Sequence, residues 1–228
     1  MTASPFSRRV LAGVAAATVL ALTPVAASAQ QKAGTPTVLA APGPGVKPTG
    51  LTTQQKETLQ AINKYFNAVR TLNGEFVQFG PDGEKSGGEF HMSRPGKIRF
   101  IYAKPSALDI VADGTDVIVR DIKNQTQDLY PLSKTPLRFL LADRIDLTSE
   151  ANVTNVSIEP DLISVVLEQS TVFGDGRLTM VFDRKTSELR QWTVTDAQGY
   201  DTSVAVYNVT ANQPTDEKLF KIDRTIIR

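Results

Sequence analysis

A two-residue alternation of apolar and polar side chains runs through most of this sequence, from about residue 75 to residue 209. It breaks into short segments, several of them separated by turn sequences such as Pro81-Asp82-Gly83, Pro95-Gly96 and Asp113-Gly114. Alternation of this kind is typical of β-strands that bury one side. We therefore predict strands at 75–80, 86–94, 97–103, 107–112, 116–122, 126–130, 153–158, 161–168, 176–183, 189–196 and 201–209.

Several of these strands carry apolar residues on both sides, as where Val181 alternates with Met180 and Phe182. A flat sheet of about eleven strands would need helices over a whole face, and the sequence offers few. A curved sheet encloses its own inner face. The sequence thus predicts a mainly β fold, an incomplete (half-open) antiparallel β-barrel of about eleven strands covered by two or three short α-helices. Gly174-Asp175-Gly176 and Gln198-Gly199 are expected to form bends between the later strands.

Two helices are predicted at positions that could close the open mouth of such a barrel. The first is capped by Thr52 or Thr53 and stops before Asn73-Gly74, and the second opens at Thr135-Pro136-Leu137 with threonine as N-cap and proline in the first turn. Their apolar stripes supply the lid residues Leu59, Ile62, Phe66, Leu137, Leu140 and Leu141, with Val69 extending the first stripe. Lys218 to Phe220 is expected to form a last helical turn.

The N-terminal residues 1–29 have the order of a secretory signal peptide. Arg8 and Arg9 precede an apolar run from Val10 to Leu22, and small residues of the A-x-A type end at Ala29. The run is shorter than the ~20 residues that span a bilayer. Export through the Sec route or through the twin-arginine route is compatible with this segment. We expect a Pro/Ala/Gly-rich flexible linker at 30–50, and one domain at 51–228.

Charge and cysteine content limit the classes of partner. Removing residues 1–29 deletes two arginines and no acids, so the formal net charge changes from +1 to −1. A balanced surface argues against nucleic acid as a partner. The chain has no cysteine, which excludes both disulfides and lipid attachment at an N-terminal cysteine.

A catalytic site is not expected. His91 is the only histidine, so a zinc site built on several histidines is excluded, and no thiol nucleophile exists. No G-x-S-x-G elbow occurs. His91 alternates with Phe90 and Met92 and is expected to face away from the apolar row. We predict no catalytic residues, no metal site and no cofactor.

One residue departs from the apolar rows. The alternation places Phe90, Met92 and Arg94 on the same side of one strand. An arginine that is buried there must find hydrogen-bond acceptors, which a lid helix could supply. Alternatively, Arg94 extends to water at the strand end. The residues alone leave both interpretations open.

Together these segments resemble the periplasmic outer-membrane lipoprotein carrier proteins, the LolA family. The resemblance is carried by Ser93-Arg94-Pro95-Gly96-Lys97-Ile98-Arg99-Phe100-Ile101-Tyr102, by Ile110-Val111-Ala112-Asp113-Gly114 and by Leu132-Ser133-Lys134-Thr135-Pro136-Leu137. It extends from about Thr52 to the C-terminus. The long Pro/Ala linker departs from the family pattern.

The resemblance implies a soluble periplasmic carrier. Such a protein receives acylated lipoproteins from an ATP-driven release complex of the inner membrane and passes them to an outer-membrane receptor. That receptor is itself a lipoprotein of similar fold, and the missing cysteine argues that this chain is the carrier, which we expect to be a monomer. The resemblance also implies that Arg94 holds the lid shut when no cargo is bound.

The alternation of side chains along each strand indicates which residues could form the walls of an acyl-chain cavity. They are Phe90, Met92, Ile98, Phe100, Tyr102, Leu178, Met180 and Phe182. Ordinary core packing is the alternative for each of them. For the whole chain, the alternatives are a periplasmic binder or sensor of another amphiphile, such as a glycolipid or phospholipid, and a hydrolase with an unrecognised site.

Overall fold

The computed structural model describes residues 50–150, 152–171, 174–222 and 224, and these belong to one compact unit. The predicted signal peptide at 1–29, and the predicted linker except for Gly50, lie outside the described residues. Within the described ranges, no helix combines the length and the apolar character that a membrane crossing requires.

Eleven antiparallel strands form one continuous sheet in the order β6-β5-β4-β3-β2-β1-β11-β10-β9-β8-β7. The strands are β1 (Thr71–Phe79), β2 (Lys85–Ser93), β3 (Lys97–Tyr102), β4 (Leu108–Asp113), β5 (Asp116–Asp121), β6 (Thr126–Pro131), β7 (Val153–Ile158), β8 (Leu162–Thr171), β9 (Gly174–Asp183), β10 (Leu189–Thr195) and β11 (Asp201–Ala211). Within the described residues the end strands β6 and β7 do not pair with each other, so the barrel is incomplete. The predicted half-open barrel is confirmed.

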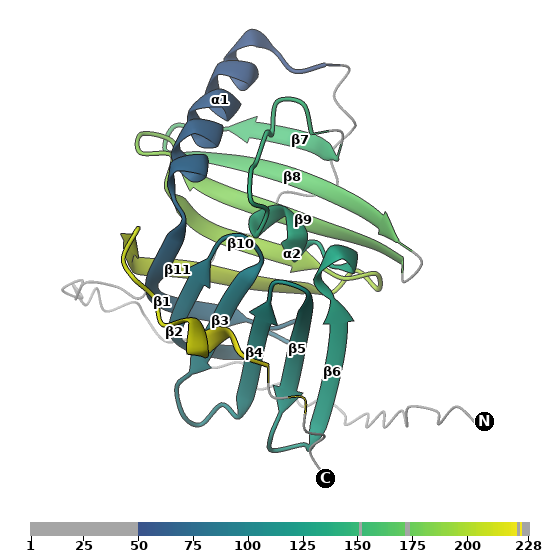
Figure 1. Cartoon of the computed structure of the whole chain (residues 1–228). Coiled ribbons are helices and arrows are strands. Elements are labelled where there is room, and N and C mark those ends of the chain that lie inside the picture. Colours follow the sequence, from purple (N-terminus) through teal and green to yellow (C-terminus); the bar gives the residue numbers. More distant parts are fainter. Residues whose placement is uncertain (1–49, 151, 172–173, 223, 225–228) are drawn as a thin grey trace, which may run out of the picture. The chain divides into compact units, whose positions relative to one another are not determined.

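The sheet is strongly curved. In Figure 1 strands β7 to β10 run across the upper part of the view, and β2 to β6 stand nearly upright below them. Strands β1 and β11 pair with each other and join these two groups. Figure 1 shows helix α1 (Thr53–Ala68) at the upper left, beside β7 and β8, and helix α2 (Leu137–Leu140) between the two groups of strands.

Helix α1 begins at a capping box. The hydroxyl of Thr52 accepts from the backbone N–H of Gln55 at 3.2 Å, and the Gln55 side chain accepts from the Thr52 N–H at 2.9 Å. The predicted apolar stripe is buried, with Leu59, Ile62 and Phe66 fully covered. The helix ends at Ala68, several residues before the predicted stop.

The predicted stop, Asn73-Gly74, lies inside strand β1. The register between β1 and β11 shifts between Asn73 and Glu75, as at a β-bulge. A Cβ on Gly74 would lie 3.0 Å from the carbonyl oxygen of Tyr207, so glycine permits this close approach. Asn-Gly was therefore wrongly taken as a helix terminator, because the same pair also suits a bulge.

Two further local predictions are wrong. Helix α2 has only four residues, and Thr135 does not cap it: the Thr135 hydroxyl donates to the carbonyl of Leu132 at 3.0 Å and closes the preceding 3₁₀ turn η1 (Leu132–Lys134). Pro136 is the N-cap. Residues 174–176 belong to β9 and pair with β8, so they are not a bend. The predicted last turn near Lys218 is confirmed as the 3₁₀ turn η2 (Glu217–Phe220).

Candidate functional site

The strand register brings the predicted apolar rows together on the concave face. Phe90 pairs with Phe100, and Met92 pairs with Ile98. Residues directly opposite each other on neighbouring strands share a face of the sheet. All four side chains are buried. Arg94 follows them immediately beyond the end of β2.

Arg94 is buried, with 4% of its surface exposed, and its guanidinium bonds to two separate parts of the cover. Nη1 donates to the carbonyl oxygens of Phe66 and, at 3.2 Å, Val69, at the C-terminal end of α1. Nε donates to the carbonyl of Ala142 at 2.8 Å and Nη2 to that of Asp143 at 3.3 Å, in the segment after α2. One side chain thus joins a strand of the barrel to both parts of the structure that covers it.

The end of α1 is suited to a cation. The last carbonyls of a helix lack partners within the helix and carry the negative end of its dipole. The last turn of α1 contains no basic residue, and Arg94 supplies the positive charge from another element. The Arg94 guanidinium also lies 4.5 Å from the ring centroid of Phe66.

The environment of Arg94 lowers its pKa to about 10, mainly because burial disfavours the charged form and also because Arg70 is near, while Asp143 acts in the opposite direction. Arg94 remains charged at neutral pH. Arg70 itself forms an ion pair with Asp143 at 2.7 Å, in which both side chains are exposed.

Two asparagines of α1 bind the segment that follows α2. Asn67 donates to the carbonyl of Ile145 at 2.7 Å and accepts from its N–H at 2.8 Å. Asn63 accepts from the N–H of Leu147 at 2.9 Å. We call α1, α2 and residues 141–150 together the lid. These bonds make the lid one hydrogen-bonded unit, to which Arg94 attaches β2.

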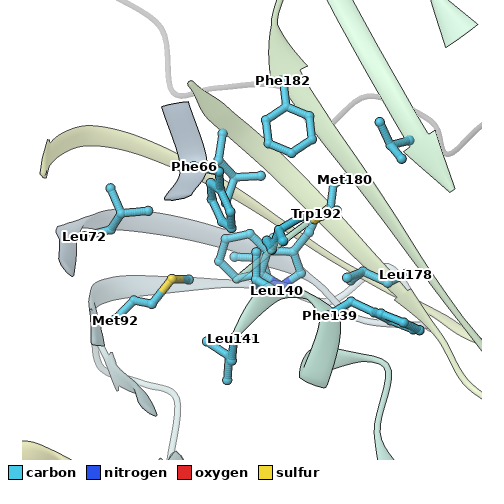
Figure 2. Close-up of a cluster of buried hydrophobic side chains, with 14 of the residues drawn as sticks. Phe66, Leu72, Met92, Phe139, Leu140, Leu141, Leu178, Met180, Phe182 and Trp192 are labelled. Carbon is cyan, nitrogen blue, oxygen red and sulfur yellow. The ribbon is translucent and has the colours of Figure 1, made fainter. Parts of the chain in front are cut away.

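The predicted cavity residues lie beneath this lid. Leu178, Met180 and Phe182 of β9 join Phe90, Met92, Ile98 and Phe100 in one buried cluster, to which Tyr102 is attached as a partly buried member. Of the predicted lid residues, Leu59, Ile62, Phe66, Leu140 and Leu141 belong to the cluster, and Leu137 is partly buried against it. Figure 2 shows side chains of the lid and of the sheet meeting in this cluster. Side chains of the lid therefore occupy the concave face of the sheet.

Tyr102 differs from the other predicted cavity residues. Its hydroxyl donates to the Gln78 side chain at 2.7 Å, and burial raises the pKa of Tyr102. Both residues line an open hollow of about 1200 Å³ among the ends of β1 to β4. Charged side chains such as Lys85 and Glu89 also line it, so this hollow is not the apolar site.

Sequence reasoning missed several residues of the site. Trp192 and Phe139 belong to the buried cluster, and the Trp192 ring packs against both Phe90 and Phe100, with ring centroids 6.4 and 6.2 Å away. The alternation of side chains along β10 could have indicated Trp192, because its neighbours 191 and 193 point to the opposite face of the sheet. The spacing of Asn63 and Asn67 by one helical turn was a further signal, because asparagine is unfavourable inside a helix unless its side chain has a specific partner.

His91 lies on the other face of β2. Its Nδ1 is 2.8 Å from the side-chain oxygen of Asn73, and the residue is half-buried. The pairing of Asn73 with His91 across β1 and β2 accounts for this contact.

A family model and a related protein that match this chain both carry the description of an outer-membrane lipoprotein carrier protein. A family model described as "Outer membrane lipoprotein carrier protein LolA" matches residues 67–223. The outer-membrane lipoprotein carrier protein of Halorhodospira halophila is 29% identical over 183 residues, which cover 76% of this chain and 85% of that protein.

Two solved structures illustrate more distant likeness. A LolA superfamily protein from Nitrosomonas europaea has a TM-score of 0.38 at 12% identity, and the match covers 74% of this chain and 99% of that chain. The complex of MucA and MucB from Pseudomonas aeruginosa gives a TM-score of 0.42 at 13% identity over 72% of this chain. This chain spans only 60% of the length of that matched chain. The family match covers most of the sequence, including Arg94, α2 and residues 141–150, and so this chain belongs to the LolA family of outer membrane lipoprotein carrier proteins.

Proposed function

We propose that this chain is a periplasmic carrier that ferries acylated lipoproteins between the two membranes of the envelope. It accepts them from an ATP-driven release complex of the inner membrane and delivers them to an outer-membrane receptor. Membership of the carrier family supports the cargo class. The single observation that carries the mechanism is the buried Arg94, whose guanidinium holds two parts of the lid over an apolar face.

An apolar interior suits this task for energetic reasons. Burying one methylene is worth about 0.8 kcal/mol, so exposing a ~16-carbon chain to water costs on the order of 13 kcal/mol. This corresponds to about nine powers of ten in an equilibrium constant. A membrane and a protein interior are both apolar, so exchange between them is close to balance. Small differences in free energy between the empty and the loaded protein can then set the direction of transfer.

The acyl chains are proposed to enter between the lid and the concave sheet. Their walls would be the residues that now meet in the closed cluster, with Phe90, Met92, Ile98, Phe100, Tyr102, Leu178, Met180 and Phe182 on the sheet and the apolar residues of α1 and α2 on the lid. Met92 and Met180 are suited to variable acyl chains because thioether side chains are flexible and polarisable.

Arg94 acts as a latch in this proposal. Cargo that lifts the lid separates the guanidinium from the carbonyls of α1 and of the segment after α2. The loaded form therefore lacks bonds that the empty form has, and delivery of the cargo restores them. The lid is a two-state element whose balance is set by the ligand.

Depletion of the protein in its native cell tests the route. Outer-membrane lipoproteins should then accumulate at the inner membrane, as shown by fractionation of the two membranes. Unchanged lipoprotein distribution after depletion would rule out the proposed route. Mass spectrometry of the ligand that copurifies with the protein tests the cargo: triacylated lipoproteins are expected, and a glycolipid or phospholipid alone would favour the amphiphile binder.

A further inference from the structure

The two end strands of the sheet differ in how their outer edges are covered. The edge of β7 lies against the start of α1, where the Gln55 side chain donates to the carbonyl of Val156 at 2.9 Å. The edge of β6, at the other end of the sheet, has no neighbouring strand among the described residues. Two consecutive side chains of β6, Leu129 and Tyr130, are 47% and 48% exposed. An uncovered edge of this kind is a template for a further strand.

The hydrogen bonds between β5 and β6 show which backbone groups of β6 point away from the sheet. The N–H of Leu132, the residue after β6, donates to the carbonyl of Thr115 at 2.8 Å, and the two strands pair without a register shift. In an antiparallel ladder every second residue bonds to the partner strand, and the residues between them point to the other side. The backbone groups of Gln127, Leu129 and Pro131 therefore point outward. Within the described ranges no residue hydrogen-bonds to them.

The outer edge of β6 is close to the apolar interior. Val117 of β5 belongs to the concave cluster, and Val119 packs against it. Tyr130 pairs with Val117 and so lies on the same face of the sheet, one strand further out. In Figure 1 β6 is the outermost strand of the lower group, at the right. The edge of β6 therefore borders the concave face on the side that α1 does not cover.

We propose that β6 binds the peptide segment that directly follows the acylated N-terminal residue of a cargo lipoprotein. The segment adds to the sheet as an extended strand beside β6. This inference rests on the proposed carrier function, because acyl chains in the concave interior hold the attached peptide at the border of that interior.

Pairing with an edge strand suits cargo of varied sequence. The bonds come from main-chain N–H and C=O groups, which every peptide has. Side chains of the added strand alternate between the concave side, beside Tyr130, and the convex side, beside Leu129. The only charged residue of β6 is Asp128, so few side chains of the cargo are excluded by charge.

The acyl chains explain why the cargo peptide occupies this edge in preference to an unrelated peptide. A short strand without an anchor pairs only weakly in water. A peptide whose acyl chains are already bound pairs with β6 as an intramolecular step, at a high effective concentration. The edge therefore discriminates by attachment to the acyl chains and needs no sequence motif.

Synthetic lipopeptides test this inference with the chain that lacks the predicted signal peptide, residues 30–228. Two ligands carry the same acylated cysteine. One ends there as an amide, and the other continues with serine and threonine residues for a length equal to that of β6. Dissociation constants are measured by calorimetric titration. The longer ligand should bind at least about tenfold more tightly, because its backbone adds several hydrogen bonds.

N-methylated versions of the longer ligand are the matched controls. An N-methyl group removes one N–H and blocks pairing on the side to which it points. Successive N–H groups of an extended peptide point to opposite sides, so one ligand is methylated at the odd residues and another at the even residues. One of the two should lose the tenfold gain and the other should keep it.

Substitutions in β6 locate the contact. Leu129→Pro removes an outward N–H and leaves the bonds to β5 in place, as proline on an edge strand can. It should abolish the gain of the longer ligand. Its affinity for the short ligand should stay unchanged, which also shows that the variant is folded. Leu129→Ala keeps the backbone donor and should retain most of the gain. If Leu129→Pro does not bind the short ligand, Gln127→Pro, which also removes an outward N–H, replaces it.

Four results would overturn the inference. Equal affinity for the short and the long ligand would show that the peptide segment is not bound. A gain that survives both proline substitutions would place the segment elsewhere on the protein. A gain that survives both methylation patterns would show that side chains, and not the backbone, are recognised. A dimer in sedimentation that Leu129→Pro dissociates would assign the edge to a second copy of this chain. Failure of both ligands to bind would instead contradict the carrier function itself, and the inference with it.

Discussion

Phe66 contacts Arg94 through both its backbone and its ring. Its carbonyl oxygen accepts from the Arg94 guanidinium, and its ring centroid lies 4.5 Å from the guanidinium carbon. The same ring packs edge-on against Phe182 in the concave cluster. A ligand that displaces α1 and so separates Phe66 from Phe182 would therefore also disturb the bonds of Arg94. In the proposed mechanism, this geometry would couple occupancy of the apolar interior to the latch.

Substitution Arg94→Leu should produce a folded protein that accepts cargo and transfers it poorly. Leucine fills apolar volume but cannot donate to the four carbonyls that Arg94 serves. At about 1 kcal/mol for each of the four hydrogen bonds, the closed empty form is destabilised by about 4 kcal/mol, so cargo should bind up to about 1,000-fold more tightly. Transfer of a lipoprotein to the purified receptor measures this effect.

Arg94→Lys is the matched variant for that experiment. Lysine keeps the charge but concentrates its donors at one atom, so it can serve only part of the set of carbonyls. We expect transfer between that of the natural protein and that of Arg94→Leu. Normal transfer by Arg94→Leu would contradict the latch.

Substitution Asn67→Ala should loosen the lid without touching the latch or the interior. It removes the donor to the Ile145 carbonyl and the acceptor for the Ile145 N–H. Two bonds at 0.5–1.5 kcal/mol each predict a loss of about 1–3 kcal/mol in the free energy of unfolding, measured with urea. Gln60→Ala, at an exposed position of the same helix, is the control and should change stability by less than about 0.5 kcal/mol. An equal loss in both variants would disprove a specific role for Asn67.

The strands and α1 were predictable because their signals are local. Alternation with period two marks a strand wherever its partner lies, and the Thr52–Gln55 capping box marks the start of α1 within four residues. Helix α2 was misjudged because four residues carry too little periodicity to distinguish a helix from a turn. The pair Asn73-Gly74 was misjudged because the same residues suit a helix end, a turn and a bulge.

The hydrogen-bond partners of Arg94 could not be predicted from local sequence patterns. Parity placed Arg94 on the buried side, but its acceptors are backbone carbonyls of residues 66, 69, 142 and 143. Every residue has such a carbonyl, so only the tertiary fold selects these four.

Trp192 should report directly on acyl chains in the interior. It is the only tryptophan, it is buried, and its ring packs against Phe90 and Phe100 in the concave cluster. Bromine atoms on an acyl chain quench indole fluorescence only at contact distance. A lipopeptide with brominated chains should therefore quench Trp192 emission, whereas its non-brominated counterpart should not. Equal emission with the two lipopeptides, once binding is verified separately, would place the acyl chains outside this cluster.

Lid stability should fall in acid because of Asp146. Its carboxylate accepts from the hydroxyls of Ser149 and Thr148 at 2.6 and 2.5 Å, and these bonds lower the pKa of Asp146 from 3.8 to about 2. A depressed carboxyl pKa adds stability that is complete above the unfolded pKa and disappears as pH falls through the folded pKa. The natural protein should thus exceed Asp146→Asn in unfolding free energy by a constant amount above about pH 5, and the difference should shrink toward pH 2. Urea unfolding of both proteins across this range is the measurement, and because asparagine does not titrate, a difference that stays constant down to pH 2 would show that Asp146 has no such role.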